Sequence, residues 1–146
     1  MLESASRFMA TTKPADWQPV ARAARLAGHA IIGAQLFDRD LVLFRTKNGD
    51  LGLISAWCAH LGVTLEAGWV DADAIRCGYH GWAFDLTGRC THIPGEPDAW
   101  KDGIQLAAYP VRESGGIIWA YGGNDNEPDL PSLDALMRAH GAGVPD

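Results

Sequence analysis

Four residues in two short segments have side chains that commonly bind metal ions. Cys58 and His60 are separated by one residue and Cys77 and His80 by two, so the order along the chain is Cys, His, Cys, His. Thiolates donate strongly to ferric iron and other soft metal ions, whereas a neutral imidazole donates less charge. Spacings this short let one tight loop direct both of its ligands toward one small site. The sequence therefore predicts a metal centre with two thiolate and two imidazole ligands.

This ligand set suits two kinds of centre. In a mixed-ligand 2Fe–2S cluster, two Cys bind one iron and two His bind the other, so each loop must supply one ligand to each metal. The interleaved order found here does that. A tetrahedral zinc site in an interaction module would use the same residue types, but zinc sites usually pair Cys with Cys and His with His. The spacing favours the iron–sulfur cluster and leaves zinc as the alternative.

Small and aromatic residues adjoin these ligands. Glycine adopts backbone conformations that other residues avoid and lets amide N–H groups approach cluster sulfurs, where they stabilise the reduced state; the glycines concerned are Gly62, Gly78 and Gly81. Trp82 could pack over the site or donate its indole N–H to a partner. The residues expected immediately around the ligands are Gly62, Tyr79, Gly81 and Trp82.

Two further candidate ligands, Cys90 and His92, follow the second segment. The ligand set is complete without Cys90, which is expected to be a buried, apolar residue. His92 could approach the site, but a surface or hydrogen-bonded loop position is the simpler expectation. The odd count of 3 Cys does not suit a disulfide framework, which favours metal binding for the other two.

Apolar, β-forming runs alternate with turn residues through most of the chain, which predicts an all-β fold. Three antiparallel strands are expected at residues 31–37, 41–45 and 51–56, joined by turns at 38–40 and 47–50; the second turn contains an Asn-Gly hairpin signal. Further strands are expected at residues 16–20, 74–76, 83–90 as a hairpin, 108–113 and 116–121, the last two closing the sheet.

The length of 146 residues fits one domain. Residues 1–15 are polar and poorly periodic and are expected to be a flexible N-terminal segment, residues 16–127 to form the domain, and residues 128–146 to be a linker and a short helix. Ser132 is the expected N-cap of that helix and Gly141 its end. The helix could dock on its own sheet or on another domain.

Composition narrows the functional classes. A net charge of −6, a pI near 5.2 and the lack of a basic stripe argue against nucleic-acid binding. No apolar run approaches the roughly 20 residues that span a bilayer, and the first residues lack a secretory signal, so we expect no membrane association and a cytoplasmic location.

The segments CAHLGVTLEAG and CGYHGWAFDLTGRCTHIPGEP resemble the two cluster-binding boxes of the Rieske domain. The run HGWAFDLTGRC, followed by YPVRESGGIIWAYGG, is similar to the N-terminal domain of Rieske non-haem iron oxygenase alpha subunits, which hydroxylate or demethylate aromatic and related substrates. The resemblance spans residues 17–131. It implies a Rieske-type 2Fe–2S cluster in an antiparallel β-sandwich with a small cluster-binding subdomain of two loops.

The resemblance also implies a redox function and its partners. One electron would pass from a reductase or ferredoxin to a mononuclear non-haem iron oxygenase site. Respiratory Rieske proteins carry a disulfide and a Ser at positions that are Val63, Tyr79 and Trp82 here, so the potential should lie near the low end of the range of roughly −150 to +300 mV.

One motif of the oxygenase family is missing. Its catalytic D-x-x-H-x-x-x-x-H box does not occur in residues 1–146, so no catalytic residue is expected in this chain. The chain would then be an oxidoreductase component of a Rieske oxygenase system. Two forms are possible: a separate electron-transfer protein, or the Rieske domain of a longer alpha subunit.

Overall fold

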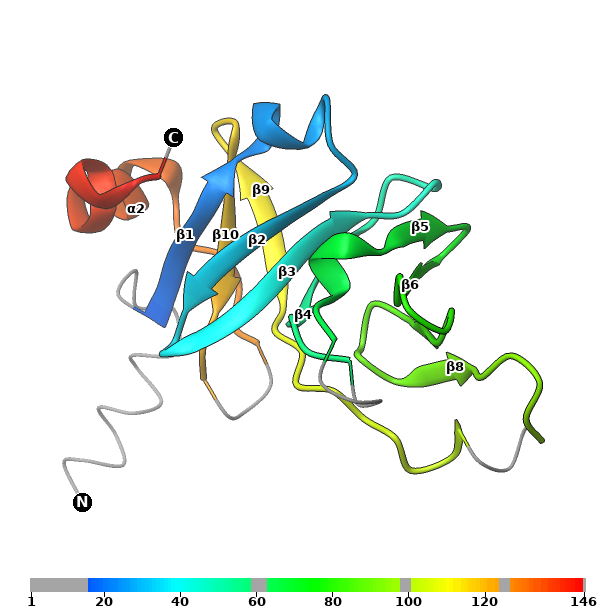
Figure 1. The fold of residues 1–146 in the computed structure, drawn as a ribbon. Coiled ribbons are helices and arrows are strands. Elements are labelled where there is room, and N and C mark those ends of the chain that lie inside the picture. Colours follow the sequence, from blue (N-terminus) through cyan, green and yellow to red (C-terminus); the bar gives the residue numbers. More distant parts are fainter. Residues whose placement is uncertain (1–15, 59–62, 98–100, 124–126, 146) are drawn as a thin grey trace, which may run out of the picture.

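The computed structural model describes residues 16–58, 63–97, 101–123 and 127–145. These residues form three antiparallel sheets and one short α-helix (Figure 1), which confirms the all-β prediction. The strands are β1 (Trp17–Arg22), β2 (Ile31–Leu36), β3 (Arg39–Arg45), β4 (Leu51–Ser55), β5 (Trp69–Asp71), β6 (Ala74–Arg76), β7 (Ala83–Phe84), β8 (Cys90–His92), β9 (Val111–Ser114) and β10 (Ile117–Tyr121). The helices are the 3-10 turns η2 (Ala23–Leu26), η3 (Leu65–Ala67) and η5 (Gly141–Gly143), and the α-helix α2 (Leu133–His140).

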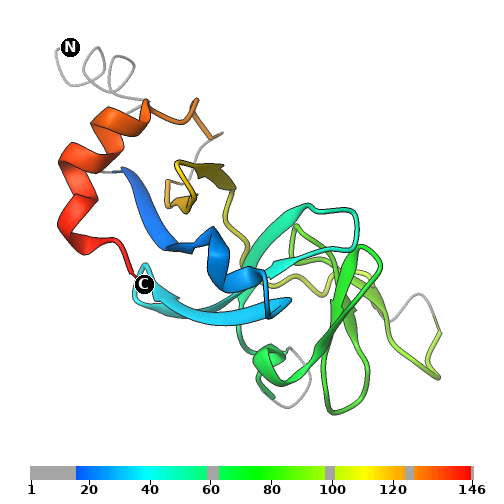
Figure 2. The same cartoon turned by 90° about the horizontal axis from the view of Figure 1, so that it is seen from above.

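The three sheets have the strand orders β1-β10-β9, β2-β3-β4 and β5-β6-β7-β8. In both Figure 1 and Figure 2 the four-stranded sheet lies at one end of the molecule and α2 at the other. The two predicted ligand loops adjoin the four-stranded end, because one follows β4 and precedes β5 and the other joins β6 to β7.

The central strand β3 is buried on both faces. Successive residues of a strand point to opposite faces, so Leu41 and Leu43 pack with β1, β9 and β10 in one core cluster. Val42 and Phe44 face the other way and pack in a second cluster with residues of the four-stranded sheet. This placement explains why residues 41–44 of β3 are continuously apolar instead of alternating.

The prediction for the last two strands was wrong in one respect. Residues 117–121 do form β10, but β10 pairs with β1, in the register Trp17 with Tyr121, and so belongs to a different sheet from β2, β3 and β4. Strand β9 begins at Val111, directly after Pro110, whose carbonyl oxygen accepts from the N–H of Tyr121 at 3.0 Å. The first hairpin turn is also displaced: Phe37 and Asp38 occupy it, both with positive φ, and Arg39 already pairs with Leu36.

Two elements near the first ligand loop were not predicted. The region after the loop contains η3, capped by the Thr64 hydroxyl oxygen, which accepts from the N–H of Glu66 at 3.2 Å. Strand β5 follows and pairs with β6. Both elements are three residues long, too short to leave a periodic pattern in the sequence.

The C-terminal helix α2 docks on its own sheet. Ser132 caps it as predicted, since its hydroxyl oxygen accepts from the N–H of Ala135 at 3.2 Å. Leu136 is fully buried in a cluster with residues of β1 and β10, including Trp17 and Trp119. No helix of the described chain is both long and apolar enough to span a membrane.

Candidate metal centre

The first ligand loop leaves the end of β4 and is closed by backbone hydrogen bonds. The N–H of Cys58 donates to the carbonyl oxygen of Val63 at 2.7 Å, and the N–H of Leu65 donates to that of Ala56 at 2.6 Å. Trp57 and Thr64 form an isolated antiparallel bridge between these two bonds. The chain therefore returns beside itself, and Cys58 lies at the base of a loop whose other predicted ligand is His60.

The second ligand loop joins β6 to β7 and is closed in the same way. The N–H of Cys77 donates to the carbonyl oxygen of Trp82 at 2.8 Å, and the N–H of Gly81 donates back to the carbonyl oxygen of Cys77 at 3.0 Å. In both loops the cysteine N–H thus bonds the carbonyl five residues later. Gly81 has a φ of 76°, in the left-handed region that favours glycine.

Glycines bring the two ligand loops together. A Cβ on Gly68 would lie 1.8 Å from the carbonyl oxygen of Arg76, and one on Gly78 would lie 2.7 Å from that of Ala67. The backbone just after the first loop therefore rests against the start of the second loop, at a separation that a larger residue would prevent. The sequence analysis expected Gly78 to bring an amide N–H toward the cluster sulfurs; that remains a prediction, and the backbone of Gly78 does not have positive φ.

The predicted thiolate and imidazole ligands differ in burial. Cys58 is 2% exposed and Cys77 is fully buried, and both belong to the core cluster beneath the four-stranded sheet. His80 is exposed. Its ring lies against that of Tyr79, with 3.9 Å between the ring centroids, and Tyr79 is 59% exposed. A metal group held here would have its sulfur ligands inside the protein and the His80 imidazole at the surface.

The remaining predicted site residues are placed as follows. Trp82 is half-buried and packs against the same core cluster as the thiols. His60 and Gly62 lie outside the described residues, and within the described ranges no three His, Cys, Asp or Glu side chains gather to hold a metal ion. The ligand set of Cys58, His60, Cys77 and His80 therefore stays a prediction.

Cys90 is fully buried as expected, in the same core cluster, and all three cysteines are free thiols. Burial raises the pKa of the Cys90 thiol, against a smaller lowering by a hydrogen bond with the His92 backbone. Cys90 therefore behaves as an apolar core residue.

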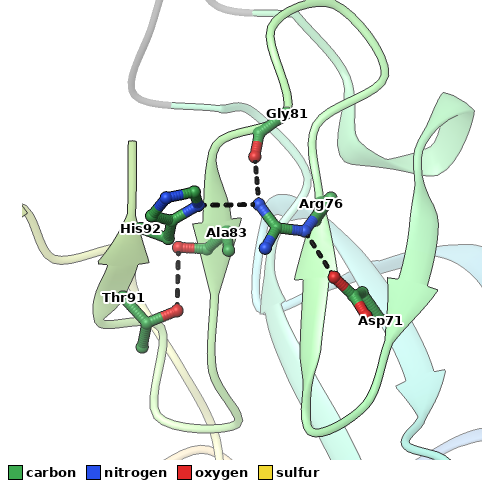
Figure 3. Close-up of polar contacts among 6 residues, drawn as sticks. All are labelled: Asp71, Arg76, Gly81, Ala83, Thr91 and His92. Atoms are coloured by element: carbon green, nitrogen blue, oxygen red, sulfur yellow. Dashed lines mark hydrogen bonds and ion pairs between the residues drawn. The ribbon is translucent and has the colours of Figure 1, made fainter. Parts of the chain in front are cut away.

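A charged side chain that no sequence pattern singles out contacts the second ligand loop. Arg76, directly before Cys77, donates to the carbonyl oxygen of Gly81 at 2.7 Å and to the Asp71 carboxylate at 2.7 Å (Figure 3). The same guanidinium lies 3.1 Å from Nδ1 of His92. His92 is thus exposed and hydrogen-bonded, as expected, but on strand β8 instead of a loop. The hydrogen bond from Arg76 lowers the pKa of Asp71.

Comparison with characterised proteins finds one matching family and several similar oxygenase subunits. The Rieske [2Fe-2S] domain family matches residues 16–110. The chain is 37% identical over 130 residues to the 5,5'-dehydrodivanillate O-demethylase oxygenase subunit of a Sphingobium species, a match that covers 86% of this chain and 31% of the relative. It is 36% identical over 124 residues to the 3-chlorobenzoate-3,4-dioxygenase oxygenase subunit of Comamonas testosteroni, covering 82% and 29%.

Solved structures agree with the sequence relatives. Dicamba monooxygenase superimposes with a TM-score of 0.71 at 26% identity, covering 84% of this chain and 40% of that one. The terminal oxygenase of carbazole 1,9a-dioxygenase from Nocardioides aromaticivorans gives 0.69 at 26% identity, covering 82% and 35%. The chain thus spans about a third of the length of the oxygenase subunits that it matches.

The donor set described above fits the cofactor of this family. A Rieske-type 2Fe–2S cluster needs two thiolates on one iron and two imidazoles on the other. The structure supplies two buried thiols at the bases of two equivalently closed loops, and an exposed imidazole on the second loop. With the match over residues 16–110, these features establish that the chain belongs to the Rieske [2Fe-2S] domain family, whose cofactor is a Rieske-type 2Fe–2S cluster.

Proposed function

We propose that this chain transfers single electrons through a 2Fe–2S cluster held by Cys58, His60, Cys77 and His80. The observation that carries the proposal is the equivalent closure of the two loops, each by a bond from the cysteine N–H to the carbonyl five residues later. Cys58 and Cys77 would hold one iron, and His60 and His80 the other. When bound, such a cluster supplies a one-electron redox couple.

The difference in burial between the ligands indicates where electrons enter and leave. Cys58 and Cys77 are enclosed by the apolar core, whereas His80 is exposed beside the exposed ring of Tyr79. A redox partner can therefore approach the imidazole edge more closely than the thiolate edge. Val63, Tyr79 and Trp82 provide no disulfide or serine at this site, which supports a potential near the low end of the Rieske range of roughly −150 to +300 mV.

The relatives suggest both redox partners. Because they are oxygenase subunits, we propose a reductase or ferredoxin as the donor and a mononuclear non-haem iron oxygenase site as the acceptor. The acceptor would be either the remainder of a longer alpha subunit or a separate subunit. The sequence downstream of Asp146 in the gene distinguishes these: a two-His, one-carboxylate box there supports the first, and its absence supports the second.

The identity of the metal group is the first test. Purified protein should be coloured, should contain roughly two iron and two acid-labile sulfide atoms per chain, and should take up about one electron per chain in a reductive titration. Protein-film voltammetry should give a potential near the low end of the Rieske range. A colourless protein that contains zinc would overturn the proposal in favour of the zinc alternative.

Matched cysteine variants test the ligand set. Cys58, Cys77 and Cys90 are all buried in the same core cluster, so replacing any of them by Ala removes a similar volume. We expect Cys58→Ala and Cys77→Ala to abolish iron binding, and Cys90→Ala to retain the visible spectrum. His60→Ala and His80→Ala should also lose the Rieske electron paramagnetic resonance (EPR) signal. Retention of that signal in either cysteine ligand variant would contradict the assignment.

A further inference from the structure

Arg76 lies in a row of residues that crosses the four-stranded sheet. Trp69 pairs with Arg76, Arg76 with Ala83, and Ala83 with His92, so one residue from each of β5, β6, β7 and β8 stands in the row. Directly paired residues of adjacent strands point to the same face of a sheet. Asp71, two residues after Trp69 on β5, faces that side as well.

A small residue lets Arg76 reach its partner on β8. Ala83 stands between Arg76 and His92 in the row and presents only a methyl group to that face. The Arg76 guanidinium passes this position and comes within 3.1 Å of Nδ1 of His92. Arginine has donors and no acceptor, so this contact is a hydrogen bond in the tautomer of His92 that leaves Nδ1 without a proton.

The guanidinium has three partners on three separate segments. It donates to the Asp71 carboxylate on β5, to the Gly81 carbonyl oxygen of the second ligand loop, and to His92 on β8 (Figure 3). The side chain of Arg76 is 21% exposed, so solvent competes only partly for these bonds. Arginine carries its N–H donors in a planar, fixed arrangement and can therefore make several directed hydrogen bonds at once. The ammonium group of lysine is a single point charge on a flexible chain and cannot replace this arrangement.

The partner in the ligand loop is the residue that helps to close the loop. Gly81 donates its N–H to the carbonyl oxygen of Cys77 and accepts from Arg76 through its own carbonyl. Its neighbour His80 is a proposed ligand. Gly81 has positive φ, which glycine adopts without strain and which lets the loop turn here. Arg76 holds the Gly81 carbonyl from outside the loop.

We propose that Arg76 is a positioning residue of the metal centre: it holds the Gly81 carbonyl and thereby the second ligand loop, while Asp71 and His92 hold its guanidinium. The inference rests on the proposed assignment of Cys77 and His80 as ligands. It predicts that loss of the guanidinium loosens the loop without unfolding the domain.

The test compares variants of the cluster-containing protein. Arg76→Met removes the donors and keeps a long side chain, and Arg76→Lys keeps the charge. Arg45→Met is the matched control, because Arg45 also donates to a turn carbonyl, that of Gly49 at 3.0 Å, and pairs with a carboxylate, that of Glu113 at 3.3 Å. This control site lies at the turn between β3 and β4, outside the ligand loops.

Three readouts are needed: circular dichroism for the fold, the rate of cluster loss in the presence of an iron chelator, and the EPR spectrum of the reduced protein. We expect Arg76→Met to stay folded and to give broadened EPR features. It should lose its cluster about tenfold faster than wild type, the change expected for the loss of one hydrogen bond from a charged donor. Arg76→Lys should fall between wild type and Arg76→Met. Arg45→Met should match wild type in cluster loss and EPR.

The possible outcomes separate the two proposals. If wild-type protein binds no cluster, the proposed function fails. If wild type binds the cluster and Arg76→Met matches it in loss rate and EPR, the positioning role is wrong. Equal effects of Arg76→Met and Arg45→Met would also overturn it, because they would indicate general stabilisation.

Should Arg76→Met not fold, His92→Leu and His92→Asn provide the second comparison. His92→Leu removes the acceptor and should accelerate cluster loss. His92→Asn restores an acceptor near the position of Nδ1 and should reverse part of that effect.

Discussion

The α-carbon of Gly78 lies against the backbone carbonyl of Ala67, so close that a Cβ on Gly78 would be 2.7 Å from that oxygen. This contact joins the segment after the first ligand loop to the second loop. Because the obstacle is backbone, a side chain at position 78 could be accommodated only if one segment moved. The spacing of the two loops therefore depends on a glycine at this position.

Gly78→Ala should separate the two loops. We expect a loss of about 1–3 kcal/mol in the free energy of unfolding, as for overpacking at a tight contact, and a lower iron content in the purified protein. Denaturant unfolding and iron analysis measure the two effects. Gly28→Ala is the control, because Gly28 has nothing within 4 Å of its Cβ position and no positive φ. A Gly78→Ala protein with wild-type iron content would contradict this account.

Cys90 should be unreactive while the protein is folded. Its pKa is raised by burial, so less of it is present as the nucleophilic thiolate. Iodoacetamide at about pH 8 should leave Cys90 unlabelled in the native protein and label it after denaturation, as peptide mass spectrometry can show. Rapid labelling of native protein at Cys90 would show that this thiol is accessible.

The raised pKa of Cys90 also makes the unfolding free energy depend on pH. The folded state holds the Cys90 proton more tightly than the unfolded state, so the contribution of this thiol is fully present below its usual pKa of 9.0 and is lost as the pH rises through the raised value. The unfolding free energy of wild type should therefore fall more steeply with alkaline pH than that of Cys90→Ala. Parallel slopes for the two proteins would refute the prediction.

Asp85 organises the turn between β7 and β8. One carboxylate oxygen accepts from the N–H of Thr87 at 2.9 Å, the hydroxyl of Thr87 at 2.6 Å and the N–H of Arg89 at 3.1 Å. Asp85→Ala should lower the free energy of unfolding by about 1–2 kcal/mol, measured by urea denaturation. Asp85→Asn retains an acceptor oxygen and should lose less. The explanation fails if the Asn variant is as unstable as the Ala variant.

The helix α2 should stabilise the domain through one buried side chain. Leu136 is fully buried against β1 and β10, whereas its neighbour Met137 is 38% exposed. Leu136→Ala should cost about 2–5 kcal/mol of unfolding free energy, and Met137→Ala no more than about 0.5 kcal/mol. Similar, small effects of the two substitutions would mean that the helix is not held on this sheet in solution.

The sequence by itself determined the kind of site and most of the strands. Cys58, His60, Cys77 and His80 are predicted as ligands by residue type and spacing, because loops of one or two intervening residues leave little freedom for the ligands. The runs that became β2, β3 and β4 were evident from their apolar pattern and from the Asn-Gly turn at residues 48–49, since these are local signals.

Only the tertiary structure decided how these segments are combined. The pairing of β10 with β1 joins residues about 100 positions apart, which no local pattern specifies. The role assigned to Arg76 has the same origin: no sequence pattern places it against Asp71, Gly81 and His92. These residues meet only because four short strands align in one register. Residue types and their local spacing are given by the sequence. Contacts between distant segments depend on the register in which the strands pair.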